Sequence, residues 1–302
     1  MIDYNMIDEN ATGDISFVRK DAGRPILLRG DRNDTGKVPL FSYPLLEETG
    51  MVCHGFTTRL GGVSQEHLES LNLGFSRGDS EDNVRENFHR LADTLQVSND
   101  SFCLSVQTHT TNVIRVYKED AGNGIVTKNR YQDVDGMVTN ETGVTLVTFY
   151  ADCVPLFFVD PVKHAIGLSH SGWRGTVGRM GKVTIEKMQQ EFGSNPSDIL
   201  CAIGPSICQD CYEIGAEVAA EFEREFPKHI NEILLRKENG KYQLDLWRAN
   251  ELVLEEAGIQ KNHIAVTNVC TCCNDKLLFS HRATKGNRGN LAAVLALRDS
   301  LI

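Results

Sequence analysis

Residues 150–175, with the sequence YADCVPLFFVDPVKHAIGLSHSGWRG, contain two apolar runs that are separated by a short polar connection. VPLFFV (154–159) and AIGLSH (165–170) are short, rich in apolar side chains, and joined by turn-forming residues. Runs of this kind are typical of buried β-strands. We therefore predict that the two runs form an antiparallel hairpin.

The register of this hairpin brings a cysteine close to a histidine. If residues 160–163 form a four-residue loop, Val159 faces His164, and counting back pairs Cys153 with His170. Opposite residues of an antiparallel pair point to the same face, with Cβ atoms about 4.5–5.5 Å apart. A metal ion with ligand bonds of about 2.0–2.3 Å fits between such a thiolate and imidazole. The alternative is a buried cysteine beside a hydrogen-bonded histidine.

The rest of the chain alternates between further strand-like runs and amphipathic helices. The other strand-like runs are 51–56, 102–106, 112–117, 144–150, 199–204, 264–270 and 291–297. Helical periodicity marks residues 81–96, 177–192, 216–226 and 245–257. Asp245 is placed to cap the last helix, and Gly193 and Gly258 are placed to end the second and the fourth. Strands that are joined sometimes by hairpins and sometimes by helices predict an α+β fold with mixed sheets in one domain.

The charge balance argues against a nucleic-acid partner. The 302 residues include 31 basic and 41 acidic side chains, which gives a net charge of -10. Such a surface repels polyphosphate backbones. A few arginines in one pocket can still bind a small anion, because a guanidinium group binds phosphate through two parallel hydrogen bonds.

Location and cysteine usage also follow from the sequence. The first 20 residues are acidic and lack the apolar core of a secretory signal. The longest apolar stretch, 144–159, is interrupted by Asp152 and is too short to span a bilayer, so we expect a cytoplasmic protein with no membrane contact. Nine cysteines in such a chain favour reduced thiols and metal ligation over disulfides.

Motifs throughout the chain resemble those of the laccase-domain proteins of bacteria and vertebrates. The matching motifs, in family order, are HGFTTRLGGVS (54–64), LNLGFSRGD (71–79), QTH (107–109), YADCVPLFF (150–158), SHSGWRG (169–175), IGPSIC with CYEIG (203–215), and CT (270–271). These proteins were once described as multicopper polyphenol oxidases and are now regarded as purine nucleoside phosphorylases with adenosine deaminase activity. The resemblance implies a layered sandwich of mixed β-sheets flanked by helices. It places the catalytic domain at 39–302, after a polar leader at 1–38 that can supply one edge strand.

The resemblance also implies that His109, Cys153 and His170 are catalytic residues that bind zinc. His109 enters the set through the resemblance alone. Three protein ligands leave one zinc position for water or substrate, as in catalytic sites, and zinc can activate water for attack on C6 of adenine. Copper is less expected, because the nine histidines include none of the His-x-His pairs that hold the trinuclear centre of laccases.

Phosphorolysis additionally requires residues that bind phosphate and nucleoside. Arg59 and Arg174 in the motif loops are the candidates for a phosphate clamp. Asp152 is a candidate catalytic proton donor or a partner of the metal ligands, and Asn72 a candidate substrate contact. Loop salt bridges for the first three, and a turn cap for Asn72, are the structural alternatives. The segment FSHRATKGNRGN (279–290) departs from the family's usual Tyr-Arg pattern, so no substrate residue is assigned there.

The expected substrates are purine nucleosides (adenosine, inosine, guanosine and methylthioadenosine) with phosphate, but a different enzyme class stays open. Cys153 could attack a carbonyl with His170 as its base, as in a cysteine-type amidase or hydrolase, and a role in editing cell-wall precursors has been proposed within the family. Metal content separates the two functions, because a metal-bound thiolate is not a free nucleophile. The candidates for a second, structural metal site, although their spacing is irregular, are Cys208, Cys211, Cys270, Cys272 and Cys273.

Overall fold

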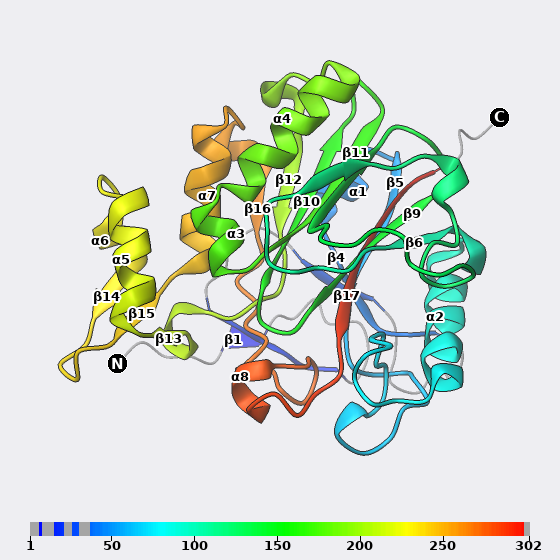
Figure 1. Cartoon of the computed structure of the whole chain (residues 1–302), viewed down its shortest axis with the longest axis horizontal. Helices are drawn as coiled ribbons and strands as arrows, with labels where there is room; N and C mark the ends of the chain where they lie inside the picture. Colours follow the sequence, from blue (N-terminus) through cyan, green and yellow to red (C-terminus); the bar gives the residue numbers. More distant parts are fainter. Residues whose placement is uncertain (1–5, 8–14, 21–25, 30–36, 299–302) are drawn as a thin grey trace.

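Two six-stranded sheets form the centre of the protein, whose computed structural model describes residues 6–7, 15–20, 26–29 and 37–298 (Figure 1). Sheet I has the order β3 (Leu27–Arg29), β4 (Leu40–Ser42), β5 (Val52–Thr57), β17 (Leu291–Leu297), β9 (Thr145–Tyr150) and β6 (Phe102–Leu104). Sheet II has the order β16 (Ile264–Val266), β12 (Leu200–Ile203), β10 (Val154–Asp160), β11 (Ala165–Ser171), β8 (Gly136–Thr139) and β7 (Val113–Arg115). Both sheets combine antiparallel pairs with parallel pairs, which confirms the predicted α+β fold with mixed sheets.

Smaller elements surround the two sheets. A three-stranded sheet consists of β13 (Glu213–Ile214), β15 (Tyr242–Leu244) and β14 (Leu234–Arg236), and β1 (Met6–Ile7) pairs with β2 (Val18–Arg19). The α-helices are α1 (Pro44–Glu47), α2 (Glu81–Leu95), α3 (Trp173–Val177), α4 (Met180–Phe192), α5 (Ala216–Glu225), α6 (Ile230–Ile233), α7 (Leu246–Glu256) and α8 (His281–Thr284).

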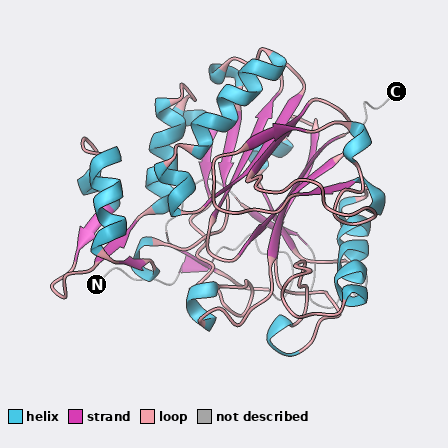
Figure 2. Cartoon of the chain, viewed as in Figure 1, coloured by secondary structure: helices cyan, strands magenta, loops and turns pink. Residues whose placement is uncertain are grey.

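The sheets pack face to face and the long helices cover their outer faces (Figure 2). Phe56 and Leu295 of sheet I share one buried core with Phe157 and Leu168 of sheet II. A second core lies between sheet II and the helices α4, α5 and α7, and a third lies between sheet I and α2. In β10 and β11 every residue is buried, because one face contributes to the core between the sheets and the other to the helix side.

The predicted helices form at their expected positions, and their ends show why. Ser80 caps α2 by accepting a hydrogen bond from the Asn83 backbone, and Asp245 caps α7 in the same way. Gly193 ends α4 in a left-handed conformation with φ of +68°. The predicted helix 177–192 is divided, because Arg179 has φ of +62° and separates the short α3 from α4.

The register predicted for the central hairpin is wrong by two residues. Val159 pairs with Ile166, and Pro155, rather than Cys153, pairs with His170. The strand continues to Asp160, whose carboxylate accepts hydrogen bonds from the next turn's backbone and so moves the loop to 161–164. A shift of two residues preserves the face to which each side chain points, so Cys153 and His170 remain on the same face.

The described parts of the N-terminal segment pack onto the core. Ile15, Phe17, Ile26 and Leu28 are each at most 4% exposed and belong to the core between the sheets. The rest of the predicted leader lies outside the described residues, and a domain boundary at residue 38 stays a prediction. Within the described part of the chain, no helix has the length and apolar composition needed to cross a membrane. A cytoplasmic location also stays a prediction.

Candidate active site

The candidate site lies where β10 begins and β11 ends. Cys153 directly precedes β10, His170 is near the end of β11, and His109 belongs to the loop between β6 and β7. One ligand atom of each residue lies within 4.8 Å of the other two, and Cys153 Sγ is 3.9 Å from His109 Nε2. The imidazole rings of His109 and His170 meet edge to face, with their centroids 4.9 Å apart. The structure therefore brings together the three residues that the sequence singled out.

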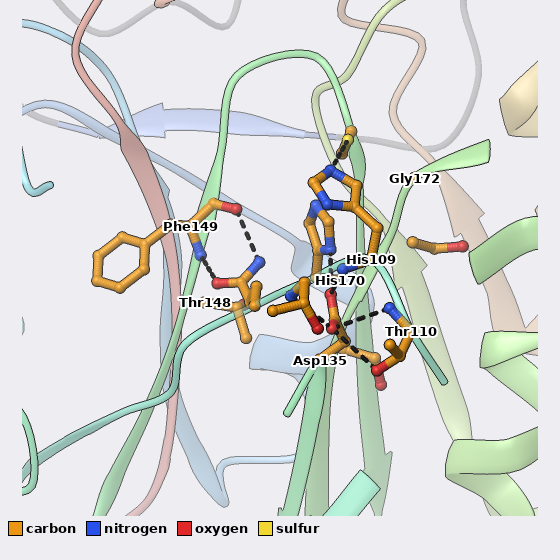
Figure 3. Close-up of polar contacts among 12 residues, drawn as sticks. His109, Thr110, Asp135, Thr148, Phe149, His170 and Gly172 are labelled. Atoms are coloured by element: carbon orange, nitrogen blue, oxygen red, sulfur yellow. Dashed lines mark hydrogen bonds and ion pairs between the residues drawn. The ribbon is translucent and has the colours of Figure 1, made fainter. Parts of the chain in front are cut away.

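Asp135 supports this cluster from inside the protein. Its carboxylate is fully buried, and one oxygen, Oδ1, lies 2.8 Å from His170 Nδ1 (Figure 3). The carboxylate also accepts hydrogen bonds from the backbone N–H groups of Thr108, His109 and Thr110. One carboxylate thus fixes both the ring of His170 and the loop that carries His109, which directs Nε2 of His170 toward the cluster.

A glycine leaves the space that the cluster needs. A Cβ atom at Gly172 would lie 3.1 Å from Cys153 Sγ and 3.0 Å from the His109 ring. Any larger residue would therefore crowd two of the three side chains, and this explains the glycine in SHSGWRG.

Two residues of the site have backbone conformations that are uncommon outside glycine. His109 has φ of +66° and Asp152 has φ of +94°. Such conformations persist only where the surroundings fix them. Asp135 binds the His109 backbone, and Asp152 is bound through its own backbone carbonyl by the Ile207 N–H group at 2.9 Å.

The electrostatics of the cluster favour a thiolate. Burial would raise the pKa of Cys153, but the charge of His170 and hydrogen bonds from both histidines outweigh this and lower the pKa to about 6. Burial would lower the pKa of His170, but Cys153 and Asp135 raise the pKa to about 9. Burial would likewise raise the pKa of Asp135, yet its bond to His170 and to the loop N–H groups lowers it.

The donor set is suited to a metal ion. Two imidazoles and one thiolate are ligands that zinc accepts, and a carboxylate behind a ligating histidine is a common supporting contact. His109 is exposed and Cys153 is half-buried, so the cluster can be reached from solvent. The structure thus contains a candidate metal centre that a substrate can approach.

The predicted phosphate-binding arginines have different surroundings. Arg174 is exposed at the start of α3, and its guanidinium group stacks on Trp173, 4.4 Å from the ring centroid. Arg59 instead braces two loops, because it donates hydrogen bonds to the backbone carbonyls of Glu69 and Asp275 and stacks on Phe279. The guanidinium group of Arg174 is therefore more available to a ligand than that of Arg59.

Asn72 and Asp152 both form side-chain hydrogen bonds within the chain. Asn72 is buried; its side chain accepts hydrogen bonds from the backbone of Gly74 and Asn290 and donates to Gly74 and Asp79. These four bonds use the full hydrogen-bonding capacity of the Asn72 amide. They therefore support the alternative that Asn72 stabilises a turn, and they do not support the predicted contact with substrate. The carboxylate of Asp152 accepts hydrogen bonds from the Thr271 hydroxyl at 2.6 Å and the Arg282 backbone at 2.7 Å.

Two residues of the site were not singled out from the sequence. Asp135 lies before β8 in a segment without a recognisable motif, and only its contacts reveal its role. Arg288 lies in the segment that departs from the family pattern. Its half-buried guanidinium group has an Nε atom without a hydrogen-bond partner. Burial and the nearby Arg77 lower the pKa of Arg288 to about 10, while the charges of Asp152 and Cys153 oppose this shift.

A layered α+β protein with an accessible cluster of two histidines and one cysteine falls in the class of candidate metal-dependent enzymes. The chain belongs to the multi-copper polyphenol oxidoreductase laccase family, whose model matches residues 53–298. The family resemblance predicted from the motifs is thereby confirmed.

Relatives and solved structures agree with this assignment. Purine nucleoside phosphorylase YlmD of Bacillus subtilis is 37% identical over 250 residues, which cover 82% of this chain and 90% of that protein. Purine nucleoside phosphorylase LACC1 of Homo sapiens is 32% identical over 271 residues, which cover 87% of this chain and 59% of that protein. The crystal structure of YlmD from Geobacillus stearothermophilus matches with a TM-score of 0.84 and 34% identity, and it covers 91% of this chain and 100% of that one.

We expect Asp135→Asn to destabilise the protein. The amide offers one acceptor oxygen instead of two and turns an N–H group toward buried donors. The free energy of unfolding should fall by about 1–3 kcal/mol, the usual cost of unpaired buried donors, measured from urea denaturation curves. Asp133→Asn is the matched control, since exposed Asp133 accepts a hydrogen bond from Thr108 in the same loop. Equal stability of the two variants would contradict the supporting role of Asp135.

Proposed function

We propose that the protein is a zinc-dependent purine nucleoside phosphorylase that also deaminates adenosine, with His109, Cys153 and His170 as the metal ligands. The observation that carries the proposal is the accessible cluster of two imidazoles and one thiolate, backed by the buried carboxylate of Asp135. The names of the relatives support the phosphorylase activity.

Zinc fits this donor set better than a copper cluster does. Three protein ligands in tetrahedral geometry leave one position open, which is the arrangement of catalytic zinc. Laccase-type copper centres need several paired histidines, and the sequence has no His-x-His pair. When bound, zinc supplies Lewis-acid catalysis and activates water at neutral pH, which deamination requires. Asp135 holds Nδ1 of His170 and so fixes the orientation in which Nε2 can ligate.

Phosphate binding falls to Arg174 and Arg288 in this proposal. Arg174 follows Gly172 by two residues and is exposed, so its guanidinium group can turn toward an anion beside Cys153. Arg288 is the second candidate, because its half-buried guanidinium group interacts electrostatically with Cys153 and Asp152. Two guanidinium groups can hold phosphate against C1′ of the ribose through charged hydrogen bonds.

Asp152 has a positioning role in this proposal. Because its carboxylate accepts two hydrogen bonds, it is held as an acceptor and fixes the backbone next to Cys153. Arg59 and Asn72 similarly maintain the loop 57–79 through the bonds described above. We expect adenosine, inosine, guanosine and methylthioadenosine to be substrates.

A cysteine-type amidase or hydrolase, acting for example on cell-wall precursors, is the second candidate function. It is favoured by the position of the Cys153 thiol beside two imidazoles, since an adjacent base activates a nucleophilic thiol. In this case the activity would not require metal.

The proposed activity is tested directly by incubating the protein with inosine, with and without phosphate. We expect hypoxanthine and ribose 1-phosphate only when phosphate is present, and inosine and ammonia from adenosine without phosphate. Inosine cleavage at the same rate without phosphate would replace phosphorolysis by hydrolysis.

We expect Cys153→Ala to abolish activity and to reduce the zinc bound per chain by about one equivalent, because the thiolate is a ligand. Elemental analysis and the inosine assay measure both effects on the same sample. Cys53→Ala is the matched control, since the thiol of half-buried Cys53 donates to the Leu95 carbonyl and is not part of the cluster. Loss of activity with full metal content would favour the cysteine hydrolase instead.

We expect Arg174→Lys to reduce phosphorolysis more than deamination. Lysine keeps the charge but lacks the planar pair of donors. Loss of one charged hydrogen bond costs about 1.5–3 kcal/mol, so phosphorolysis should fall by about 10-fold to 150-fold while deamination stays nearly unchanged. Steady-state rates with inosine plus phosphate and with adenosine measure the two activities. Arg224→Lys, on the exposed face of α5, is the control. Equal losses of both activities would show that Arg174 maintains the shape of the site.

A further inference from the structure

A second cluster of side chains lies in the described part of the chain, and it consists of cysteines alone. The Sγ atoms of Cys208, Cys211, Cys270 and Cys273 all lie within 4.8 Å of one another. Two residues separate the members of each pair, so the pattern is Cys-x-x-Cys in two loops 62 residues apart in the sequence. The fifth cysteine of the region, Cys272, does not belong to this group.

The backbone holds the two loops together. The first loop follows β12 and the second follows β16, and these neighbouring strands run parallel, so both loops leave sheet II at the same edge. Ser206 forms a bridge with Cys270, and its backbone bonds to those of Val269 and Thr271. The meeting of the two pairs is therefore a consequence of the sheet and not of flexible side chains.

The distances and hydrogen bonds suit four thiolates around one ion. Cys211 Sγ lies 3.6 Å from Cys273 Sγ. In a tetrahedral zinc site with Zn–S bonds of about 2.3 Å, neighbouring sulfur atoms are about 3.8 Å apart. The backbone N–H groups of Cys208 and Cys273 donate to Cys270 Sγ at 3.3 and 3.4 Å, and such bonds stabilise negative charge on sulfur.

A positive charge lies next to this cluster. The ammonium group of Lys20 lies 3.1 Å from the carboxylate of Asp210, a residue of the first loop. This ion pair joins the N-terminal segment to the first cysteine loop.

We propose that Cys208, Cys211, Cys270 and Cys273 bind a structural zinc ion. Four protein ligands close the coordination sphere, so this site has no position for a substrate, unlike the cluster around Cys153. On binding, four Zn–S bonds form and the thiol protons pass to solvent, so no oxidant or reductant takes part.

The bound zinc would stabilise the wall of the active site. Ile207 directly precedes Cys208, and its N–H group donates to the Asp152 carbonyl. Thr271 directly follows Cys270, and its hydroxyl donates to the Asp152 carboxylate. The zinc therefore fastens the two loops that fix Asp152 next to Cys153.

The test measures metal in the unmutated protein and in three variants, all purified under reducing conditions. Elemental analysis should find about two zinc ions per chain in the unmutated protein and about one in Cys153→Ala, whose catalytic cluster is disabled. X-ray absorption of Cys153→Ala should show about four sulfur atoms at about 2.3 Å and no nitrogen. Cys273→Ser should lose about one zinc ion, whereas Cys272→Ser, altered in the same loop, should keep about two.

Because the X-ray measurement uses Cys153→Ala, it does not depend on how well the loop variants fold. Zinc with nitrogen ligands in Cys153→Ala, or no zinc there, would overturn the proposal. So would iron in place of zinc, or fewer than nine free thiols in the denatured protein, which would indicate a disulfide. If instead the proposed catalytic site bound no zinc, the unmutated protein would contain about one zinc ion, held by four sulfur atoms.

Discussion

The pairing of β10 with β11 at the centre of sheet II is the constraint on which the rest of the structure depends. Both strands are buried on both faces, so they join the core between the sheets to the core beneath the helices. A slip by one residue would exchange the two faces and bury the wrong side chains in each core. The same pairing places Cys153 and His170 side by side, and β10 pairs with β12, which leads to the four-cysteine cluster. Packing and chemistry thus share one register.

Asp135 converts this register into a site. The distance and orientation between a histidine on a strand and a histidine in a loop are not fixed by the sheet, because the loop can move independently of it. The buried carboxylate removes that freedom, since it binds His170 and three successive N–H groups of the loop at once. This arrangement requires His109 to adopt a left-handed backbone conformation, which is unfavourable for a residue other than glycine. The hydrogen bonds to Asp135 hold it in that conformation.

The sequence predicted the elements of this fold well and their junctions less well. The apolar runs marked the central strands, and Asp245 and Gly193 marked helix ends, because these signals are local. The hairpin register was missed by two residues, since the Asp160 side chain decides where the loop begins and a run of apolar residues does not show this. Asp135 and Arg288 could not be predicted for a similar reason. Each is a single polar residue outside a motif, and its role depends on contacts with residues that are distant in the sequence. The spacing of the five cysteines looked irregular until the structure separated Cys272 from the other four.

The two clusters differ in the number of ligands that they offer. The first has three candidate ligands and suits a reaction, whereas the second has four and suits a permanent cross-link. Asp152 lies between them, with φ of +94° and bonds to residues that flank two of the four cysteines. A strained backbone next to a candidate metal ligand needs rigid support, and the loops after β12 and β16 contain little regular structure to supply it by themselves. A cross-link between these loops would supply that rigidity, which gives the four-cysteine cluster a physical reason to lie beside the candidate site.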